Sequence, residues 1–109
     1  MVDTNQDLEV REAKVTGYAA GWTGLNPKKI LANVAPGFRL IEPGGNVVTA
    51  AELPAYLAEL RKLGGQMDIR HIAVTPEVVW CEWQLGSVVG AGRIKATAEG
   101  VTEEKLYAA

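Results

Sequence analysis

The stretch GGQMDIRHIAVTPEVVWCEWQLGSVVGAGRIKATA, residues 64–98, decides the fold, because apolar residues alternate along it after helical spacing in the first half of the chain. Turn sequences at 75–77 and 86–87 divide the stretch, and strands joined by such short turns pair antiparallel. The predicted strands are 67–74, 78–85, 88–98 and, after the turn at Glu99-Gly100, 101–107. The second half of the chain therefore predicts a four-strand antiparallel meander.

The chain before this stretch predicts two helices in succession. Apolar residues at helical spacing indicate a first helix between a cap at Thr4 and a break at Gly24. Asn26 is a suitable cap for a second, shorter helix that runs to about Val34. Pro36-Gly37 follows, and we expect the helix to stop ahead of it, because the residue before a proline is biased away from helical geometry.

One strand and a third helix complete the first half. Residues 38–42 read as a strand that Pro43 ends. Thr49 to Glu52 has the pattern of a capping box, which predicts a third helix that ends at Gly64-Gly65. Helices gathered before an antiparallel meander are typical of an α+β domain whose curved, mostly antiparallel sheet wraps around them. We expect residues 1–109 to form one such domain.

Composition excludes several classes of function. The 109 residues carry a formal charge of −2 without a basic run, which does not suit a nucleic-acid binder. No apolar run approaches the length of a membrane span. Cys81 is the only cysteine and His71 the only histidine, so a zinc site of nitrogen and sulfur ligands lacks its ligands. We expect a cytoplasmic protein that uses neither a metal nor an organic cofactor.

The predicted order of helices and strands, together with two segments of the sequence, resembles the nuclear transport factor 2-like superfamily. This superfamily includes ketosteroid isomerases and SnoaL-like polyketide cyclases. The two segments are Gly17-Tyr18-Ala19-Ala20 and Phe38-Arg39-Leu40-Ile41-Glu42-Pro43. The closing stretch, from Gly90-Ala91-Gly92-Arg93-Ile94 through Gly100-Val101-Thr102, resembles the SnoaL-like branch in particular. The resemblance covers nearly the whole chain. It implies a conical α+β barrel in which three helices of the first half fill the curved sheet.

The resemblance also implies roles for individual side chains. In ketosteroid isomerases a helical tyrosine donates to the substrate oxyanion and a carboxylate that ends the first strand is the base. Carried over, Tyr18 would be the donor and Glu42 the base. The isomerases hold a second donor, a protonated aspartate, on a late strand; that neighbourhood here is Gly92, Arg93 and Ile94, and none of the three is a carboxylic acid.

Each candidate residue also has a purely structural interpretation. Tyr18 could be a core residue whose hydroxyl donates to a backbone carbonyl, and Glu42 an exposed strand end. His71, the third catalytic candidate, could face the cavity or the solvent. Cys81 alternates with apolar residues, which favours a small buried hydrophobe over a nucleophile.

A small hydrophobic ligand or substrate is the partner that these residues predict. We expect a largely apolar pocket between the helices and the sheet, with Glu42 and His71 among its polar groups. Its predicted lining is Tyr18, Trp22, Phe38, Leu40, Tyr56, Leu57, Leu60 and Trp83. Two functions fit. One is an isomerase, lyase or cyclase that moves a proton within a small apolar substrate; the other is a binding or accessory domain that holds a hydrophobic ligand without chemistry.

The outer face of the sheet predicts a second kind of contact. Alternation along 78–85 places Val79, Cys81, Trp83 and Leu85 toward the helices, and Trp80 on the opposite face together with charged residues. An aromatic residue framed by mixed charges is a common composition of interfaces. Since superfamily members usually pair through this convex face, the resemblance implies a homodimer with Trp80 near the centre of its interface.

Overall fold

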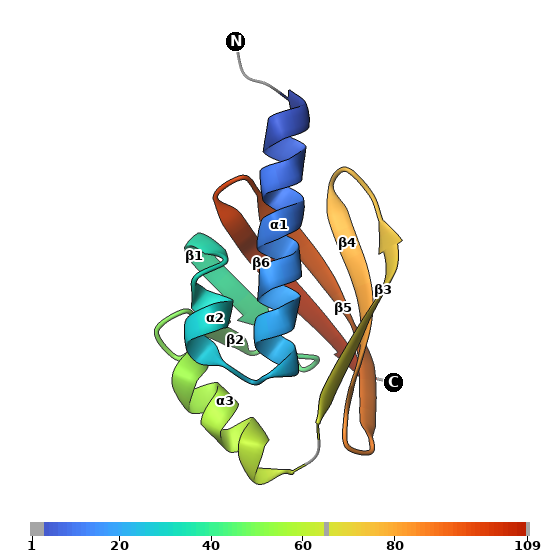
Figure 1. The fold of residues 1–109 in the computed structure, drawn as a ribbon. Helices are drawn as coiled ribbons and strands as arrows, with labels where there is room; N and C mark the ends of the chain where they lie inside the picture. Colours follow the sequence, from blue (N-terminus) through green and yellow to red (C-terminus); the bar gives the residue numbers. More distant parts are fainter. Residues whose placement is uncertain (1–3, 65, 109) are drawn as a thin grey trace.

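The computed structural model describes residues 4–64 and 66–108, which form three helices and a six-stranded sheet (Figure 1). The helices are α1 (Thr4–Thr23), α2 (Pro27–Leu31) and α3 (Leu53–Lys62). The strands are β1 (Val34–Ile41), β2 (Val47–Thr49), β3 (Met67–Val74), β4 (Val78–Leu85), β5 (Val88–Thr97) and β6 (Gly100–Ala108). Within this part of the chain, no helix has the length and apolar character needed to cross a membrane.

The sheet has the strand order β2-β1-β6-β5-β4-β3. The strands β3 to β6 pair antiparallel with their neighbours, which confirms the predicted meander. β1 joins the sheet beside β6 and runs parallel to it, while β2 pairs antiparallel with β1. The sheet is therefore mixed but mostly antiparallel, and it stays open between its edge strands β2 and β3.

The three helices lie on one side of the curved sheet, with α1 crossing the strands and α2 and α3 packed beside its C-terminal half (Figure 1). The buried stripe of α1 consists of Val15, Tyr18 and Trp22, and it meets a buried row of the sheet. Val79, Cys81 and Leu85 are buried and Trp83 is partly buried against the core, which confirms the predicted inner face of β4. The predicted α+β cone is thus the observed fold.

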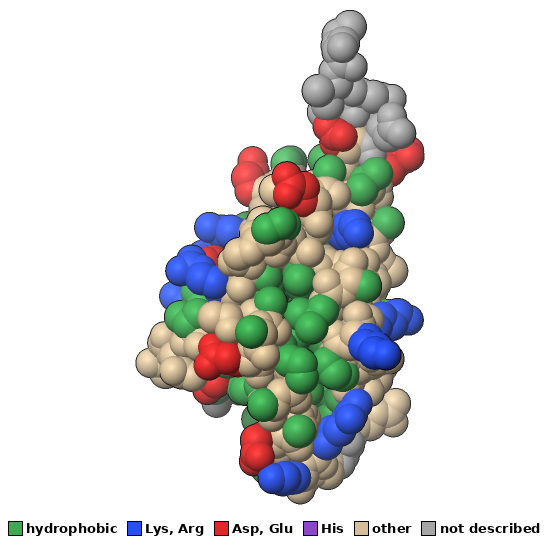
Figure 2. All heavy atoms as spheres, turned by 90° about the vertical axis from the view of Figure 1, so that its left-hand side faces the viewer, with side chains coloured by type: hydrophobic (Ala, Val, Ile, Leu, Met, Phe, Trp, Pro, Cys, Tyr) green, Lys and Arg blue, Asp and Glu red, His purple; other side chains and the backbone are tan. Residues whose placement is uncertain are grey.

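The side of the molecule that carries α2 and α3 is partly apolar at its surface. Figure 2 shows hydrophobic side chains gathered over the middle of this face, with acidic and basic groups around them.

The helix α2 begins as the sequence predicts. The side chain of Asn26 accepts a hydrogen bond from the Lys29 N–H at 3.3 Å, and Pro27 takes the first helical position.

The boundary between α2 and β1 differs from the prediction. α2 ends at Leu31, and β1 begins at Val34, four residues before the expected Phe38. Pro36-Gly37 does not break the strand. Gly37 has a φ of +81°, and the pairing of β1 with β6 shifts register between Val34 and Arg39. The dipeptide therefore forms an irregularity inside β1, a place where a strand tolerates a residue without an N–H.

The segment between β1 and α3 also differs. β2 was not predicted, because three residues are too few to show alternation; it forms when β1 turns back through Gly45, whose φ is +92°. The helix α3 then begins at Leu53. The expected capping box forms in part: the Glu52 carboxylate accepts hydrogen bonds from the Thr49 N–H at 3.1 Å and from its hydroxyl at 3.0 Å, but it caps no helical N–H.

Candidate functional site

A cavity of about 110 Å³ lies between the end of α1, the helix α3 and the inner face of β3 to β6. Its walls are almost entirely apolar, and Glu104 supplies the carboxyl group. Leu63 and Val88, which are exposed at 69% and 51%, place part of the lining at the surface. The lining is Trp22, Tyr56, Leu60, Leu63, Met67, Ile69, Cys81, Trp83, Leu85, Val88, Glu104 and Leu106.

Glu104 reaches the cavity because β6 carries a bulge. Val101 pairs with Ala96, but the next paired residue of β5, Lys95, faces Glu103, so Thr102 has no partner. An extra residue in one strand exchanges the two faces for everything beyond it. Glu104 therefore pairs with Ile94 and, like Ile94, is buried, with 5% of its surface exposed.

Gly92 on β5 makes the room that the Glu104 side chain occupies. A Cβ atom at position 92 would overlap Oε2 of Glu104 and would lie 3.1 Å from Sγ of Cys81. Gly90 likewise makes room for Trp83, because a Cβ atom at position 90 would overlap the indole ring. The two glycines of β5 thus hollow the inner face of the sheet where the cavity lies.

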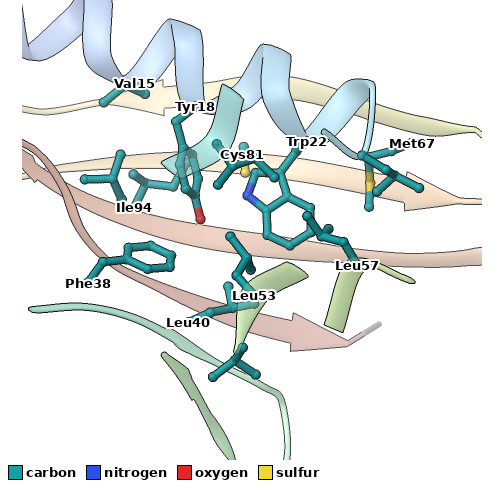
Figure 3. Packing of buried hydrophobic residues seen from close by; sticks show 14 of the residues in the cluster. Val15, Tyr18, Trp22, Phe38, Leu40, Leu53, Leu57, Met67, Cys81 and Ile94 are labelled. Carbon is teal, nitrogen blue, oxygen red and sulfur yellow. The ribbon is translucent and has the colours of Figure 1, made fainter. Parts of the chain in front are cut away.

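Tyr18 holds the carboxyl group of Glu104 from the opposite side. Its hydroxyl donates a hydrogen bond to Oε1 of Glu104 at 2.6 Å, and only 1% of Tyr18 is exposed. Burial and the negative charge of Glu104 raise the pKa of Tyr18 well above its ordinary value. Tyr18 is therefore a protonated donor at every physiological pH. Figure 3 shows its oxygen pointing from α1 toward the strands.

The pKa of Glu104 is set by two opposing effects. Burial disfavours the carboxylate and raises the pKa, while the hydrogen bond from Tyr18 favours the carboxylate and lowers it. The balance raises the pKa of Glu104 to about 7. Cys81 lies beside the group, with Sγ 4.0 Å from Oε2, and burial together with the Glu104 charge raises the pKa of its thiol to about 12. Glu104 can exchange a proton near neutral pH, and Cys81 stays a neutral thiol.

Aromatic residues form the wall that faces Glu104. The rings of Trp22 and Tyr56 pack edge to face at 6.5 Å, and Trp22 packs likewise against Tyr18 at 6.3 Å. Trp83 completes this wall, and its indole N–H donates to the carbonyl oxygen of Ala91 at 3.1 Å. Burial, and the charges of Glu42 and Glu104, raise the pKa of Tyr56 to about 12. The cavity thus combines an aromatic wall with one ionisable carboxyl group.

The structure brings part of the predicted lining together. Trp22, Tyr56, Leu60 and Trp83 line the cavity. Tyr18 lies behind Glu104 and acts on the cavity through it. The remaining predicted lining residues belong to the fully buried core rather than to the wall of the cavity, and Figure 3 shows them packed around Tyr18 and Trp22; they are Phe38, Leu40 and Leu57.

The two other catalytic candidates, Glu42 and His71, are not brought to the cavity by the described residues. Glu42 follows β1, is partly exposed, and accepts a hydrogen bond from the Asn46 side chain at 3.3 Å. It does not line the cavity, but its charge acts on Tyr56, which does. His71 pairs with Cys81 across β3 and β4, and its side chain lies outside the described part of the structure. The catalytic roles of Tyr18, Glu42 and His71 stay predictions.

The sequence prediction missed Glu104. Gly92, Arg93 and Ile94 were expected to leave their neighbourhood without a carboxylic acid, but Gly92 admits the carboxyl group of Glu104 from the adjacent strand. Alternation continued from Val101 would place Glu104 on the outer face, and the bulge at Thr102 reverses this. The available signal was the pair of glycines two residues apart in β5, because glycine in a strand often marks the close approach of another group.

No metal site is evident in the described residues, where His, Cys, Asp and Glu side chains do not gather in threes. The chemistry that the cavity itself offers is a proton exchanged at one buried carboxyl group, with a tyrosine hydroxyl as its permanent partner.

Neither family models nor curated protein sequences match this chain. Solved structures do. An NTF2-like protein of unknown function from Mesorhizobium loti superposes with a TM-score of 0.75 at 12% identity, over 93% of this chain and 92% of that one. A hypothetical protein with a ketosteroid isomerase-like fold from Catenulispora acidiphila, in complex with trimethylamine, gives 0.67 at 18% identity, over 86% and 83%. TerC, co-crystallised with polyporic acid, gives 0.73 at 13% identity, over 92% of each chain.

These likenesses extend over most of each chain, and several of the matching structures are described as NTF2-like or ketosteroid isomerase-like. The chain has the NTF2-like fold, which confirms the resemblance noted in its sequence.

The raised pKa of Glu104 makes the stability of the protein depend on pH. The folded state holds a proton on Glu104 up to about pH 7, whereas the unfolded chain releases it near the ordinary value of about 4.5. Relative to a Glu104→Gln variant, the free energy of unfolding should therefore fall by roughly 3 kcal/mol as the pH rises from about 4.5 to about 7. Urea unfolding at a series of pH values measures the difference.

Glu99→Gln, at an exposed turn, is the matched control and should follow the wild-type pH profile. If the free energies of unfolding of the wild-type protein and of Glu104→Gln change in parallel across this pH range, burial does not raise the pKa of Glu104.

Proposed function

We propose that the protein is a small-molecule enzyme of the ketosteroid isomerase or SnoaL-like cyclase type, in which Glu104 moves a proton within a small apolar substrate. The observation that carries this proposal is a buried carboxyl group with a pKa of about 7 on the wall of an apolar cavity. A group whose pKa lies near the working pH serves equally well as proton acceptor and proton donor. The resemblance implied Tyr18 as the hydrogen-bond donor and Glu42 as the base. In this proposal Glu104 is the base instead of Glu42.

The proposed step uses the two oxygens of Glu104 differently. Oε1 is occupied by the hydrogen bond from Tyr18, while Oε2 lies against Gly92 and Cys81 without a strong donor. The carboxylate takes a proton from a carbon atom next to a carbonyl group, the C–H bond breaks, and its electron pair moves onto the carbonyl oxygen as an enolate. The electron pair then returns from the oxygen to carbon, and Glu104 gives the proton back either to the same carbon or, where a C=C bond is conjugated with the enolate, to the far carbon of that bond, which leaves the enzyme unchanged.

The solved neighbours support a cavity that receives small molecules. One was crystallised in complex with trimethylamine and another with polyporic acid, and both have the fold of this chain. The cavity here is at the small end of ligand sites, which commonly span about 300–1,000 Å³. A compact substrate with few polar groups fits such a space best.

We also propose that the protein is cytoplasmic. The free, buried thiol of Cys81 is in keeping with a reducing compartment.

Deuterium exchange at the α-carbon of cyclopentanone tests the proton transfer directly. In D₂O the wild-type protein should accelerate exchange, which proton NMR follows as loss of the α-proton signal. The rate should rise with pH up to about 7 and then level off, because the ionised form of Glu104 is the base. Glu104→Gln should lower the catalysed rate by about 10²–10⁴-fold, since the amide cannot accept the proton.

Glu42→Gln is the matched variant, because it makes the same change at the carboxyl group outside the cavity lining. We expect it to keep most of the exchange activity. A Glu42→Gln variant that loses activity while Glu104→Gln keeps it would assign the base to Glu42 instead. Wild-type protein that binds the ketone without exchange would favour the binding domain over the enzyme.

We also infer a homodimer through the outer face of the sheet. Trp80 and Tyr107 project from β4 and β6 on this face with ring centroids 5.9 Å apart, and Nζ of Lys105 lies 5.4 Å from the centroid of the Tyr107 ring. Arg93 and Arg39 pair with Glu103 beside them, at 3.9 Å and 2.7 Å. A central aromatic pair within a ring of charged groups is the composition that protein interfaces favour.

Light scattering at tens of micromolar protein should give the mass of a dimer, as expected for a standard interface of roughly 1,600 Å². Trp80→Glu places a charge at the proposed centre and should give monomers, while Trp80→Phe keeps an aromatic ring there and should still give dimers. A monomeric wild-type protein, or a dimeric Trp80→Glu variant, would contradict the assignment.

A further inference from the structure

The lining of the cavity continues along the sheet to the surface at one end of the molecule. The carboxyl group of Glu104 lies over Gly92 of β5, and Val88, four residues away on the same inner face, also lines the cavity. A strand rises about 3.3 Å per residue, so this wall extends over roughly 13 Å. Because Val88 is exposed, the wall leads from the buried carboxyl group to solvent.

The helix α3 forms a second wall of similar length. Tyr56, Leu60 and Leu63 all line the cavity, and residues three and four apart lie on one side of a helix. Leu63 follows the last residue of α3 and keeps helical geometry, so at about 1.5 Å per residue the three side chains cover roughly 10 Å. Tyr56 packs against Trp22 inside the molecule, whereas Leu63 is exposed. This wall, too, runs from the interior to the surface.

The two walls end side by side. The carbonyl oxygen of Gly64 lies 4.0 Å from the position that a Cβ atom of Gly86 would take, so the end of α3 is next to the turn between β4 and β5. Figure 1 shows both at the lower end of the molecule. Leu63 and Val88, which we call the rim, therefore form an apolar exit from the cavity.

We propose that the ligand is a linear aliphatic molecule with one small uncharged polar head group, that its head lies at Glu104, and that its tail extends between α3 and β5 to the rim. The proposal rests on the proposed function for its site, the cavity, and it names the substrate class. The compact head end occupies the enclosed space of about 110 Å³. The tail covers the apolar surface of the rim, which the protein alone leaves in contact with water.

The charges of the cavity decide the head group. A carboxylate head would lie beside Glu104, and among the described residues that line the cavity no Lys or Arg offsets the repulsion. Tyr18 already occupies Oε1 of Glu104, but Oε2 has no strong donor. A hydroxyl head suits this oxygen in both of its protonation states, because a hydroxyl group donates to a carboxylate and accepts from a carboxylic acid.

The walls also set the length of the chain. Consecutive carbon atoms of an extended chain advance by about 1.3 Å, given a bond of about 1.5 Å and an angle of about 111°. Walls of roughly 10–13 Å therefore match about eight to ten carbon atoms. Each fully buried CH₂ group raises the affinity about fourfold. Affinity should thus grow along a series of linear alcohols until the tail reaches the rim.

The first experiment locates the tail in the wild-type protein by NMR of ¹³C-labelled methyl groups. 1-Butanol should shift the signals of Leu60, in the inner lining, whereas 1-octanol should also shift those of Leu63 and Val88 at the rim. Leu8 and Val74 are exposed outside the lining and serve as matched controls that should not move. If 1-octanol shifts Leu60 and leaves the rim unmoved, the tail does not follow the proposed path.

The second experiment measures dissociation constants by isothermal titration calorimetry at about pH 8. From 1-butanol to 1-octanol the affinity should rise by about 10–100-fold, which is less than full burial would give because the rim is open to solvent. Cyclooctanol, which has the same number of carbon atoms in a compact ring, should bind at least about tenfold more weakly than 1-octanol. Sodium octanoate and octylammonium should also bind more weakly, because their heads are charged.

A double variant tests the rim itself. Leu63→Asn with Val88→Thr, shown by circular dichroism to be folded, should bind 1-octanol about tenfold more weakly than the wild-type protein, and the loss should shrink as the chain shortens. Leu8→Asn with Val74→Thr makes the same two changes outside the lining and should follow the wild-type series. A loss of the same factor at every chain length would place Leu63 and Val88 in the support of the fold and would overturn their role as the rim.

The outcomes separate this proposal from the proposed function, because alcohols bind without a carbonyl group to exchange. A dependence on chain length with shifts at the rim, but no deuterium exchange of cyclopentanone, would support the linear ligand and remove the enzyme. Exchange that depends on Glu104, with cyclooctanol bound as tightly as 1-octanol, would overturn the linear ligand alone. Tighter binding of octanoate or octylammonium than of 1-octanol would overturn the uncharged head, and binding of none of these compounds would overturn the whole proposal.

Discussion

The hydrogen bond from Tyr18 to Glu104 is the interaction on which the site depends. A carboxyl group enclosed by apolar side chains either binds a proton or accepts strong hydrogen bonds, because an uncompensated buried charge is too costly. Glu104 does both in part: Tyr18 donates to Oε1 at 2.6 Å, and the pKa rises only to about 7. A stronger donor set would hold the group ionised, and an entirely apolar one would hold it protonated.

The fold holds these two residues on elements that are fastened to each other. Gly21 lets α2 approach α1, since a Cβ atom there would lie 2.7 Å from the backbone nitrogen of Ile30. Nearer the middle of α1, the buried Arg11 donates through Nε to the carbonyl of Ala96 on β5 at 3.1 Å. These two contacts lie on either side of Tyr18 along α1 and hold the helix in place against α2 and the sheet, so that Tyr18 meets β6 at one position. The bulge at Thr102 then decides which side chain of β6 it meets.

The fold was largely predictable because its signals are local. The helices α1 and α3 and the four strands of the meander follow from period, cap and turn residues, and the structure confirms them. The start of β1 could not be predicted, since it depends on pairing with β6, which is distant in the sequence, and β2 is too short to show alternation. The site was predictable only for the residues that line it from helices and from β4, such as Trp22, Tyr56 and Trp83.

Glu104 shows why the chemistry was harder to predict than the fold. Its position depends on a single unpaired residue, Thr102, and nothing in the residues 100–108 marks a bulge. One residue exchanges the faces of a strand, so a carboxylate assigned to solvent becomes the polar group of the core. The same event explains why the outer face gains Glu103 and Tyr107, which lie beside Trp80 and the arginines.

The pKa of Glu104 tests the central claim most directly. Carbon-13 NMR of the side-chain carboxyl groups, with Glu104 assigned through the Glu104→Gln variant, gives the midpoint of its titration in the folded protein. The midpoint should lie near 7, and it should rise further in a Tyr18→Phe variant, because the lost hydrogen bond favoured the ionised form. A midpoint near the ordinary value of about 4.5, unchanged in Tyr18→Phe, would contradict the assignment of Glu104 as a buried proton-transfer group.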